Sequence, residues 1–276
     1  MKLAEKNIGR LLEIAIDCHR AGNLRDAEQG YQAVLAAAPN QFDALHYFGL
    51  LKAQRGLPND ALVLIGKAVE SNPESAEANA NLGNVLLELA QADRALVYFD
   101  RALKLQPCNI HTLLGRANAL RALRRYDEAL AAYDNALAIE PRFAFALNNK
   151  GDLLKKLRQY SRAITCLEKA LELMPNHPEI LVNLGAALRG NRRPEDALTC
   201  FERALALKPE NAEAFNNRAN ALTDLHRYEE ALTSVDRALR LNPGDVDALN
   251  NRGTILANLA RHADALASFD LALQMD

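Results

Sequence analysis

Seven prolines recur at a constant spacing of 34 residues, and this spacing limits the chain to a repeated structure. They are Pro39, Pro73, Pro107, Pro141, Pro175, Pro209 and Pro243. Equal spacing predicts a row of equal repeats in which each repeat packs only on its neighbours. After a lead-in at residues 1–7, the expected single array of repeats spans 8–41, 42–75, 76–109, 110–143, 144–177, 178–211, 212–245 and 246–276, the last incomplete.

Small and large side chains alternate at fixed positions of these repeats. The eighth position is glycine or alanine and the twentieth is alanine in all eight repeats. The twenty-fourth position is occupied by larger apolar residues: Tyr31, Ile65, Phe99, Tyr133, Leu167, Phe201, Val235 and Phe269. Helices pack closely where a small residue receives a large one. Apolar residues also recur at helical spacing in two blocks per repeat, so each repeat is predicted to be an antiparallel helix pair that ends at its proline.

This pattern resembles the tetratricopeptide repeat, a 34-residue helix pair with small residues at its eighth, twentieth and twenty-seventh positions and proline at its thirty-second. The resemblance runs from residue 8 to residue 276. It implies an all-α fold, an α-solenoid that forms a right-handed superhelix of about eight helix-turn-helix units. The first helix of each repeat is then expected to line a concave groove that binds an extended peptide or a helix of a partner protein.

The family's geometry places the second, fifth, sixth, ninth, twelfth and thirteenth positions in this groove, and asparagine recurs there. The sequence-predicted peptide-binding ladder comprises Asn81, Asn84, Asn118, Asn148, Asn149, Asn183, Asn216, Asn217, Asn220, Asn250 and Asn251. A primary amide both donates and accepts, so a row of amides can bind a peptide backbone whatever its side chains. The alternative is that these amides only join neighbouring helices in a duplicated repeat.

Two tripeptides make the resemblance more specific. Asn81-Leu82-Gly83 and Asn183-Leu184-Gly185 are similar to the superhelical arm of the O-linked N-acetylglucosamine transferases, in which an asparagine ladder holds the protein substrate. In that family the catalytic domain follows the repeats, and this chain has no room for one. We therefore expect a non-catalytic interaction scaffold. The alternative is the substrate-recognition arm of a larger glycosyltransferase whose catalytic domain is absent from this chain.

Basic residues cluster at the expected turns between the two helices of the fourth, fifth and sixth repeats. They are Arg121, Arg124, Arg125, Lys155, Lys156, Arg158, Arg189, Arg192 and Arg193. They predict an edge for an anionic partner, or else a solvated rim. Aromatic residues are only 5% of the chain and do not interleave with these cations, which argues against nucleic acid. A net charge of −2 adds no general attraction to nucleic acid or to a membrane.

The other residues form no recognisable catalytic, metal-binding or phosphate-binding pattern. The six histidines occupy six different repeat positions and no glycine-rich phosphate loop is present, so no enzyme activity, metal or cofactor is expected. No apolar run is long enough for a membrane helix, and the four cysteines are expected to be reduced in a cytoplasmic protein.

On the last helix, Leu266, Phe269 and Leu273 predict an open C-terminal edge, which either continues into a longer protein or associates with another copy or partner.

Overall fold

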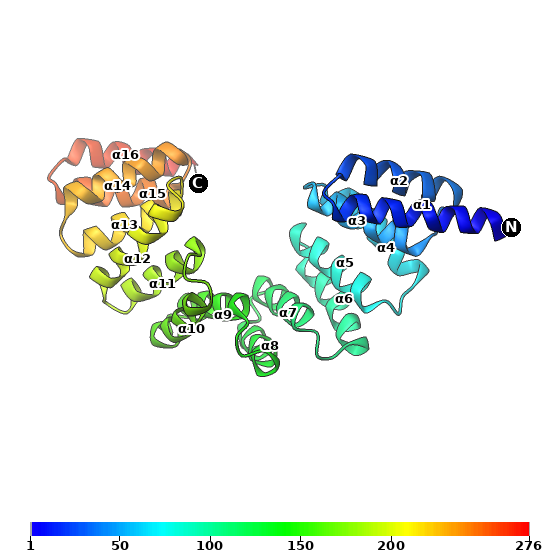
Figure 1. The fold of residues 1–276 in the computed structure, drawn as a ribbon. Coiled ribbons are helices and arrows are strands. Elements are labelled where there is room, and N and C mark those ends of the chain that lie inside the picture. The colour runs from blue at the N-terminus through cyan, green and yellow to red at the C-terminus, as the bar shows by residue number, and fades with distance from the viewer. Residues whose placement is uncertain (1, 276) are drawn as a thin grey trace. The chain divides into compact units, whose positions relative to one another are not determined.

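The computed structural model describes the backbone of residues 2–275 and the side chains of residues 7–275. Over these residues the chain forms sixteen α-helices (Figure 1). The first eight are α1 (Lys2–Arg20), α2 (Leu24–Ala37), α3 (Phe42–Gln54), α4 (Pro58–Ser71), α5 (Ala76–Glu88), α6 (Ala92–Leu105), α7 (Ile110–Ala122) and α8 (Tyr126–Ile139). The other eight are α9 (Ala144–Lys156), α10 (Tyr160–Leu173), α11 (Pro178–Gly190), α12 (Pro194–Leu207), α13 (Ala212–Asp224), α14 (Tyr228–Leu241), α15 (Val246–Asn258) and α16 (His262–Met275).

The helices belong to two compact units, Met1–Pro141 and Arg142–Asp276, which we call the N-terminal and C-terminal units. Within each unit, the two helices of a repeat pack together and the second helix packs on the first helix of the next repeat. From the second repeat onward, every first helix has 13 residues and every second helix has 14, as in α3 and α4. The prediction of an all-α solenoid of helix pairs with a 34-residue register is therefore confirmed.

Each repeat turns between its helices through one residue in the left-handed region. In all eight repeats the fifteenth position has a positive φ, and only Gly22 and Gly56 are glycines there. The turn after α9 shows the hydrogen bonds that hold this conformation: Arg158 N donates to Lys155 O, and Gln159 N donates to Leu154 O, both at 2.9 Å. These two bonds form a Schellman motif, which satisfies carbonyls that the end of a helix leaves without partners.

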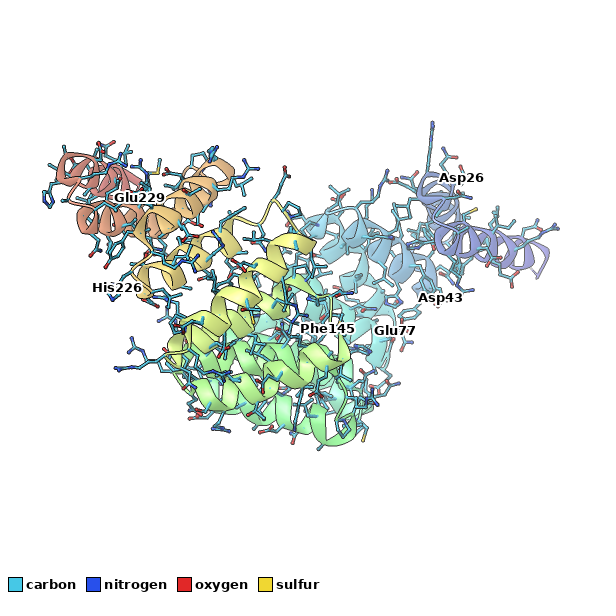
Figure 2. All side chains as sticks on the ribbon, turned by 60° about the vertical axis from the view of Figure 1, so that its left-hand side comes forward. Asp26, Asp43, Glu77, Phe145, His226 and Glu229 are labelled. Carbon is cyan, nitrogen blue, oxygen red and sulfur yellow. The ribbon has the colours of Figure 1, made fainter. Side chains whose placement is uncertain are left out.

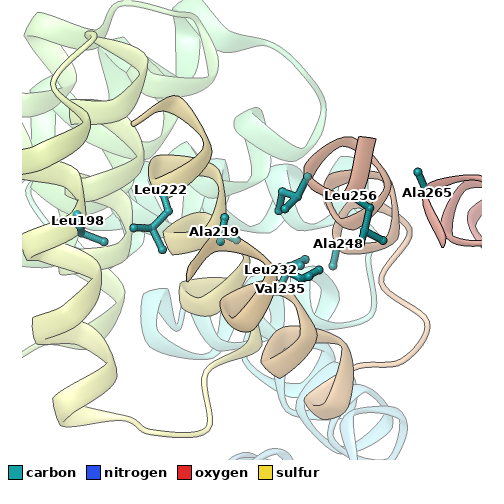
Figure 3. Packing of buried hydrophobic residues seen from close by; sticks show 10 residues of the cluster. Leu198, Ala219, Leu222, Leu232, Val235, Ala248, Leu256 and Ala265 are labelled. Atoms are coloured by element: carbon teal, nitrogen blue, oxygen red, sulfur yellow. The ribbon is translucent and has the colours of Figure 1, made fainter. Parts of the chain in front are cut away.

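Close contacts between the eighth and twenty-fourth positions form the core of each repeat. A Cβ atom added to Gly185 would lie 2.6 Å from Cε1 of Phe201, so α11 and α12 approach at a distance that only glycine allows. Gly253 and Phe269 make the same contact between α15 and α16. The predicted pairing of small with large residues is thus confirmed. Figure 3 shows how buried side chains of successive repeats, among them Leu222, join into one cluster in the C-terminal unit.

Arginines at the seventh position connect three helices at once. Arg252 on α15 donates from Nε to Oδ1 of Asp236 on α14, and from Nη1 to Oγ of Ser268 on α16, each at 2.7 Å. Arg218 makes the corresponding contacts with Glu202 and Ser234. The long side chains cover apolar surface while their charged ends pair with partly exposed carboxylates. These arginines therefore help to fix the spacing of adjacent repeats.

The last helix leaves apolar side chains uncovered. Leu266 on α16 is 62% exposed, whereas Leu232, which has the same repeat position on α14, is 8% exposed because α15 covers it. Leu273, further along α16, is 75% exposed. The predicted open apolar edge is therefore present on the described part of α16.

Candidate peptide-binding face

The first helices of the C-terminal unit form the candidate site. Helices α9, α11, α13 and α15 contact one another in sequence. Side-chain caps fix where two of them begin: the side chain of Asn211 accepts from Ala214 N, and that of Asp245 accepts from Ala248 N, each at 3.0 Å. Such caps satisfy amides that a helix start leaves free. Because α9, α11, α13 and α15 each begin at the first position of a repeat, the same repeat positions lie in register from helix to helix. We call the surface formed by their predicted groove positions the first-helix face.

Several asparagines of the predicted ladder bind each other across the repeats. Asn183 Nδ2 donates to Asn148 Oδ1 at 3.1 Å, and Asn251 Nδ2 donates to Asn216 Oδ1 at 2.8 Å. In the N-terminal unit, Asn81 Nδ2 lies 3.0 Å from Nε2 of His46. In each case the sixth position of one repeat contacts the fifth position of the repeat before it. Hydrogen bonds between neighbouring helices therefore account for part of the asparagine pattern.

Asn217 lacks this cross-repeat pairing. The fifth position of the preceding repeat is Val182, which is 3% exposed and has no side-chain acceptor. Asn217 is partly exposed, and its amide makes no hydrogen bond within residues 7–275. Asn220, one helical turn later on α13, is also partly exposed, and Asn250 on α15 is exposed. Neither side chain has a hydrogen-bond partner in that range. These three amides are free to bind a ligand.

The remaining ladder residues lie in different surroundings. Asn148 is buried, and its Nδ2 lies 3.3 Å from Oδ1 of the partly exposed Asn149. In the N-terminal unit, Asn84 is exposed, and Asn118 accepts a 2.7 Å hydrogen bond from the hydroxyl of Tyr133. The structure thus brings together the ladder residues of the C-terminal unit on α9, α11, α13 and α15. It places Asn81, Asn84 and Asn118 on α5 and α7 of the other unit.

A charged pocket of about 470 Å³ opens on this face. Its lining, which we call the ion-pair pocket, consists of Asp152, Lys155, Lys156, Tyr160, Ala186, Arg189, Gly190 and Asp224. Lys155 Nζ lies 2.8 Å from Oδ1 of Asp152 and 2.8 Å from Oδ1 of Asn183, so the pocket adjoins the paired asparagines. Across the pocket, Arg189 Nε lies 2.7 Å from Oδ2 of Asp224.

The predicted basic edge is partly neutralised by local carboxylates. Arg125 in the N-terminal unit binds Glu128 through two 2.7 Å hydrogen bonds, which raise the pKa of the arginine and lower that of the glutamate. Arg193 in the C-terminal unit similarly lies 2.7 Å from Asp196. Cations without an ion pair among the described residues occupy the left-handed turn position: Arg124, Arg158 and Arg192. Of the other residues of this edge, Arg121 lies on α7, and Lys155, Lys156 and Arg189 line the ion-pair pocket.

Sequence reasoning missed an aromatic contact beside this face. Phe145 at the start of α9 is 49% exposed (Figure 2), and its ring meets the ring of His177 edge-on, with centroids 6.3 Å apart. Nδ1 of His177 is buried and has no hydrogen-bond partner among the described residues. A second pocket of about 470 Å³ includes His177 and Val182. The available signal was that Phe145 is the only large apolar residue at the second position of the repeats.

Comparison with known families agrees with this geometry. Family models described as tetratricopeptide repeat match residues 52–117, 112–143, 142–210 and 216–276. The chain belongs to the tetratricopeptide repeat family. No curated protein matches it. The sixteen helices of residues 2–275 are too short or too polar to span a bilayer. Within the same residues, no three His, Cys, Asp or Glu side chains gather into a possible metal site.

Solved tetratricopeptide repeat proteins share the fold. The crystal structure of the APC/C hetero-tetramer Cut9–Hcn1 aligns with a TM-score of 0.74 at 19% identity, covering 92% of this chain and 50% of that one. This chain therefore spans only half the length of that match. PilF of Pseudomonas aeruginosa aligns with a TM-score of 0.65 at 24% identity, covering 75% and 94%. YrrB, described as a TPR protein with an unusual peptide-binding site, aligns with a TM-score of 0.54 at 29% identity, covering 67% and 95%.

Proposed function

We propose that this tetratricopeptide repeat protein is a non-catalytic interaction scaffold whose C-terminal unit binds an extended peptide of a partner protein on the first-helix face. Proteins of this family typically serve as interaction scaffolds. The observation that carries the proposal is the free amide of Asn217, whose neighbour Val182 offers it no acceptor. The peptide-binding site described for YrrB, at 29% identity, supports the same use of the fold.

The free amides suit a peptide backbone. Asn217 and Asn220 are three residues apart on α13, so their side chains occupy the same side of the helix. Each offers an N–H donor and a carbonyl acceptor, the two groups that an extended backbone presents in alternation. Binding through such groups is tolerant of the peptide's side chains. We therefore expect Asn217, Asn220 and Asn250 to make the main backbone contacts, while the paired amides of Asn183 and Asn251 support the helices that carry them.

Peptide binding by single-residue variants tests this division. An unbiased peptide array identifies a binder, and fluorescence polarisation then measures its affinity. Asn217→Ala is expected to weaken binding about three- to tenfold, the value of one hydrogen bond. Val182→Asn, which supplies the missing acceptor, is expected to weaken binding while keeping the amide. The control is Asn251→Ala, which removes a paired amide on the next first helix. Affinity unchanged in both Asn217→Ala and Val182→Asn would refute the proposed contact.

The substrate arm of a glycosyltransferase is a narrower form of this function. The tripeptides that begin at Asn81 and Asn183 favour it. In the structure those two amides pair with His46 and Asn148, so hydrogen bonds between helices explain them without a bound substrate. A coding sequence that continues beyond residue 276 into a nucleotide-sugar-binding domain would support this hypothesis. A stop codon at that point would remove it.

A further inference from the structure

We propose that the ion-pair pocket binds a carboxylate side chain of the partner peptide. This inference rests on the proposed function, and it adds the chemical class of one partner residue. Lys155 places the pocket beside the asparagines of the first-helix face, since its Nζ is 2.8 Å from Oδ1 of Asn183. A peptide lying along that face can therefore direct one of its side chains into the pocket.

The charge of the lining favours an anion. Three cations, Lys155, Lys156 and Arg189, and two carboxylates, Asp152 and Asp224, line the pocket, so the formal charges of its lining sum to +1. Both carboxylates already accept from a cation, at 2.8 Å in the Lys155–Asp152 pair and 2.7 Å in the Arg189–Asp224 pair. A basic peptide side chain would have to compete with these pairs. An acidic side chain would instead bring the number of negative charges to three, equal to the positive ones.

Arg189 retains most of its hydrogen-bond donors. Its Nε binds Asp224, but neither terminal nitrogen makes a hydrogen bond within residues 7–275. Arg227, by contrast, uses both Nε and Nη2 on Glu230, each at 2.7 Å. The side chain of Arg189 is 37% exposed, so the open edge of its guanidinium is accessible to a ligand. A planar guanidinium matches the two oxygens of a carboxylate, and charge-assisted hydrogen bonds of this kind are among the strongest in proteins.

Gly190 keeps the pocket open and shapes its wall. A Cβ atom at this position would lie 2.6 Å from Cζ of Tyr160, so the tyrosine ring rests directly against the backbone of α11. The same repeat position in the neighbouring repeats holds Lys156 and Asp224, whose side chains are larger. The hydroxyl of Tyr160 makes no hydrogen bond within the described side chains, and it provides another donor at the wall. The terminal nitrogens of Arg189 and the hydroxyl of Tyr160 can thus donate to an acceptor-only carboxylate.

Three peptides that differ in one residue test the inference. Each is acetylated, amidated and built from alanine and serine, with glutamate, glutamine or lysine at its centre. Fluorescence polarisation measures their affinity for the full chain. We expect the glutamate peptide to bind at least about fivefold more tightly than the glutamine peptide, and the lysine peptide to bind more weakly than either. The preference for glutamate should fall as the salt concentration is raised. Equal affinity for glutamate and glutamine would overturn the inference.

A charge-neutral double variant tests which residues produce the preference. Arg189→Gln with Asp224→Asn removes one positive and one negative charge, so the net charge of the pocket stays the same while the free guanidinium edge is lost. We expect the ratio of glutamate to glutamine affinity to fall close to one. Lys169→Gln is the control, because Lys169 is exposed on the second helix α10, has no ion pair among the described residues and lies outside the pocket. A ratio that survives in the double variant would overturn the inference.

The two proposals fail in different ways. If glutamate and glutamine peptides bind equally and Asn217→Ala weakens both, the first-helix face binds peptides without discriminating by charge. Only the inference about the ion-pair pocket is then contradicted. If none of the three peptides binds the wild-type chain, the proposed function is contradicted as well. The readout is a ratio of affinities measured on one variant, so a uniform loss of folded protein does not alter it.

Discussion

Asn183 donates a hydrogen bond from Nδ2 to Oδ1 of Asn148, 3.1 Å away on the first helix of the preceding repeat. Both residues are buried, at 7% and 4% exposure. An amide pair in this position satisfies polar groups that would otherwise be costly to bury, and it joins two adjacent repeats. The asparagine ladder therefore contains residues of two kinds, those that hold repeats together and those, such as Asn217, that keep a free amide.

This division predicts that two similar substitutions have different effects on stability. Asn183→Ala leaves the buried Asn148 without its cross-repeat donor, and we expect it to lower the free energy of unfolding by about 1–3 kcal/mol. Asn217→Ala removes no hydrogen bond, and we expect a change within about 0.5 kcal/mol. Urea unfolding followed by circular dichroism measures both. Equal loss of stability in the two variants would mean that the amide pair does not contribute as the structure indicates.

A second prediction concerns Asn79, which occupies a position held by leucine in most repeats. Asn79 is fully buried; its Nδ2 donates to Pro73 O at 2.9 Å and to Ser75 O at 2.8 Å, but its Oδ1 has no partner among the described residues. Because Pro73 is exposed, water can satisfy its carbonyl. We expect Asn79→Leu to raise the free energy of unfolding by about 1 kcal/mol, measured by urea unfolding.

The reverse change is the control for Asn79. Leu45 has the same repeat position on α3 and is 2% exposed. Leu45→Asn introduces a buried polar group and removes apolar contacts, so it should destabilise the chain by about 2 kcal/mol or more. If Asn79→Leu also destabilises, the two hydrogen bonds of Asn79 outweigh the cost of its unpaired oxygen.

The fold could be predicted from the sequence because its determinants are local and repeat eight times. The glycine or alanine at the eighth position and the proline at the thirty-second each mark a packing or boundary requirement, and Gly185 against Phe201 shows the contact that the spacing implies. The site was less predictable. Whether an asparagine pairs with the preceding repeat depends on the residue 35 positions earlier, as the contrast between Asn148 and Val182 shows. That relationship appears only when helices of neighbouring repeats are in place.

The ion-pair pocket could not be predicted from the sequence for a similar reason. Lys155, Lys156 and Arg189 were recognised as basic, but their pairing with Asp152 and Asp224 requires side chains from three first helices. Gly190 carries no sequence signal by itself, because its effect is the space it leaves for Tyr160 from the preceding repeat. Spacing along the chain thus predicted where cations occur, while the hydrogen bonds that remain open followed only from the packed structure.

The left-handed turns yield a third prediction. Arg158 has φ of 58°, a conformation in which a Cβ atom is unfavourable and glycine is not. Arg158→Gly should therefore stabilise the chain by about 0.5–1 kcal/mol. Gly56→Ala, at the same position in the second repeat, should destabilise it by a similar amount, since no neighbouring atom limits the space there. Thermal unfolding of both variants measures the effect, and a loss of stability on Arg158→Gly would contradict it.

A fourth prediction follows from His46. Burial lowers the pKa of this imidazole, and the nearby Glu77 and Asp43 oppose the shift only in part. The folded state therefore binds the proton less readily than the unfolded chain, whose histidine has a pKa of about 6.5. Stability should be fully present above that pH and should fall as the pH drops below it. Urea midpoints at pH 7.5 and 5.5 should differ more in the wild-type chain than in His46→Gln, which keeps an acceptor for Asn81. An equal difference would exclude His46 as the cause.

The last prediction compares two leucines that share one repeat position. Leu232 is covered by α15, so Leu232→Gln buries a polar group and should cost about 2–4 kcal/mol of unfolding free energy. Leu266 is 62% exposed, so Leu266→Gln should change stability by less than about 0.5 kcal/mol. Urea unfolding separates these cases. Light scattering of the second variant also tests one of the two alternatives for the open edge of α16, association with another copy. In that case the apparent mass of the wild-type chain should rise with concentration, and that of Leu266→Gln should stay constant. At a concentration where the chain is monomeric, a large stability loss in that variant would show that another part of the protein covers Leu266 in solution.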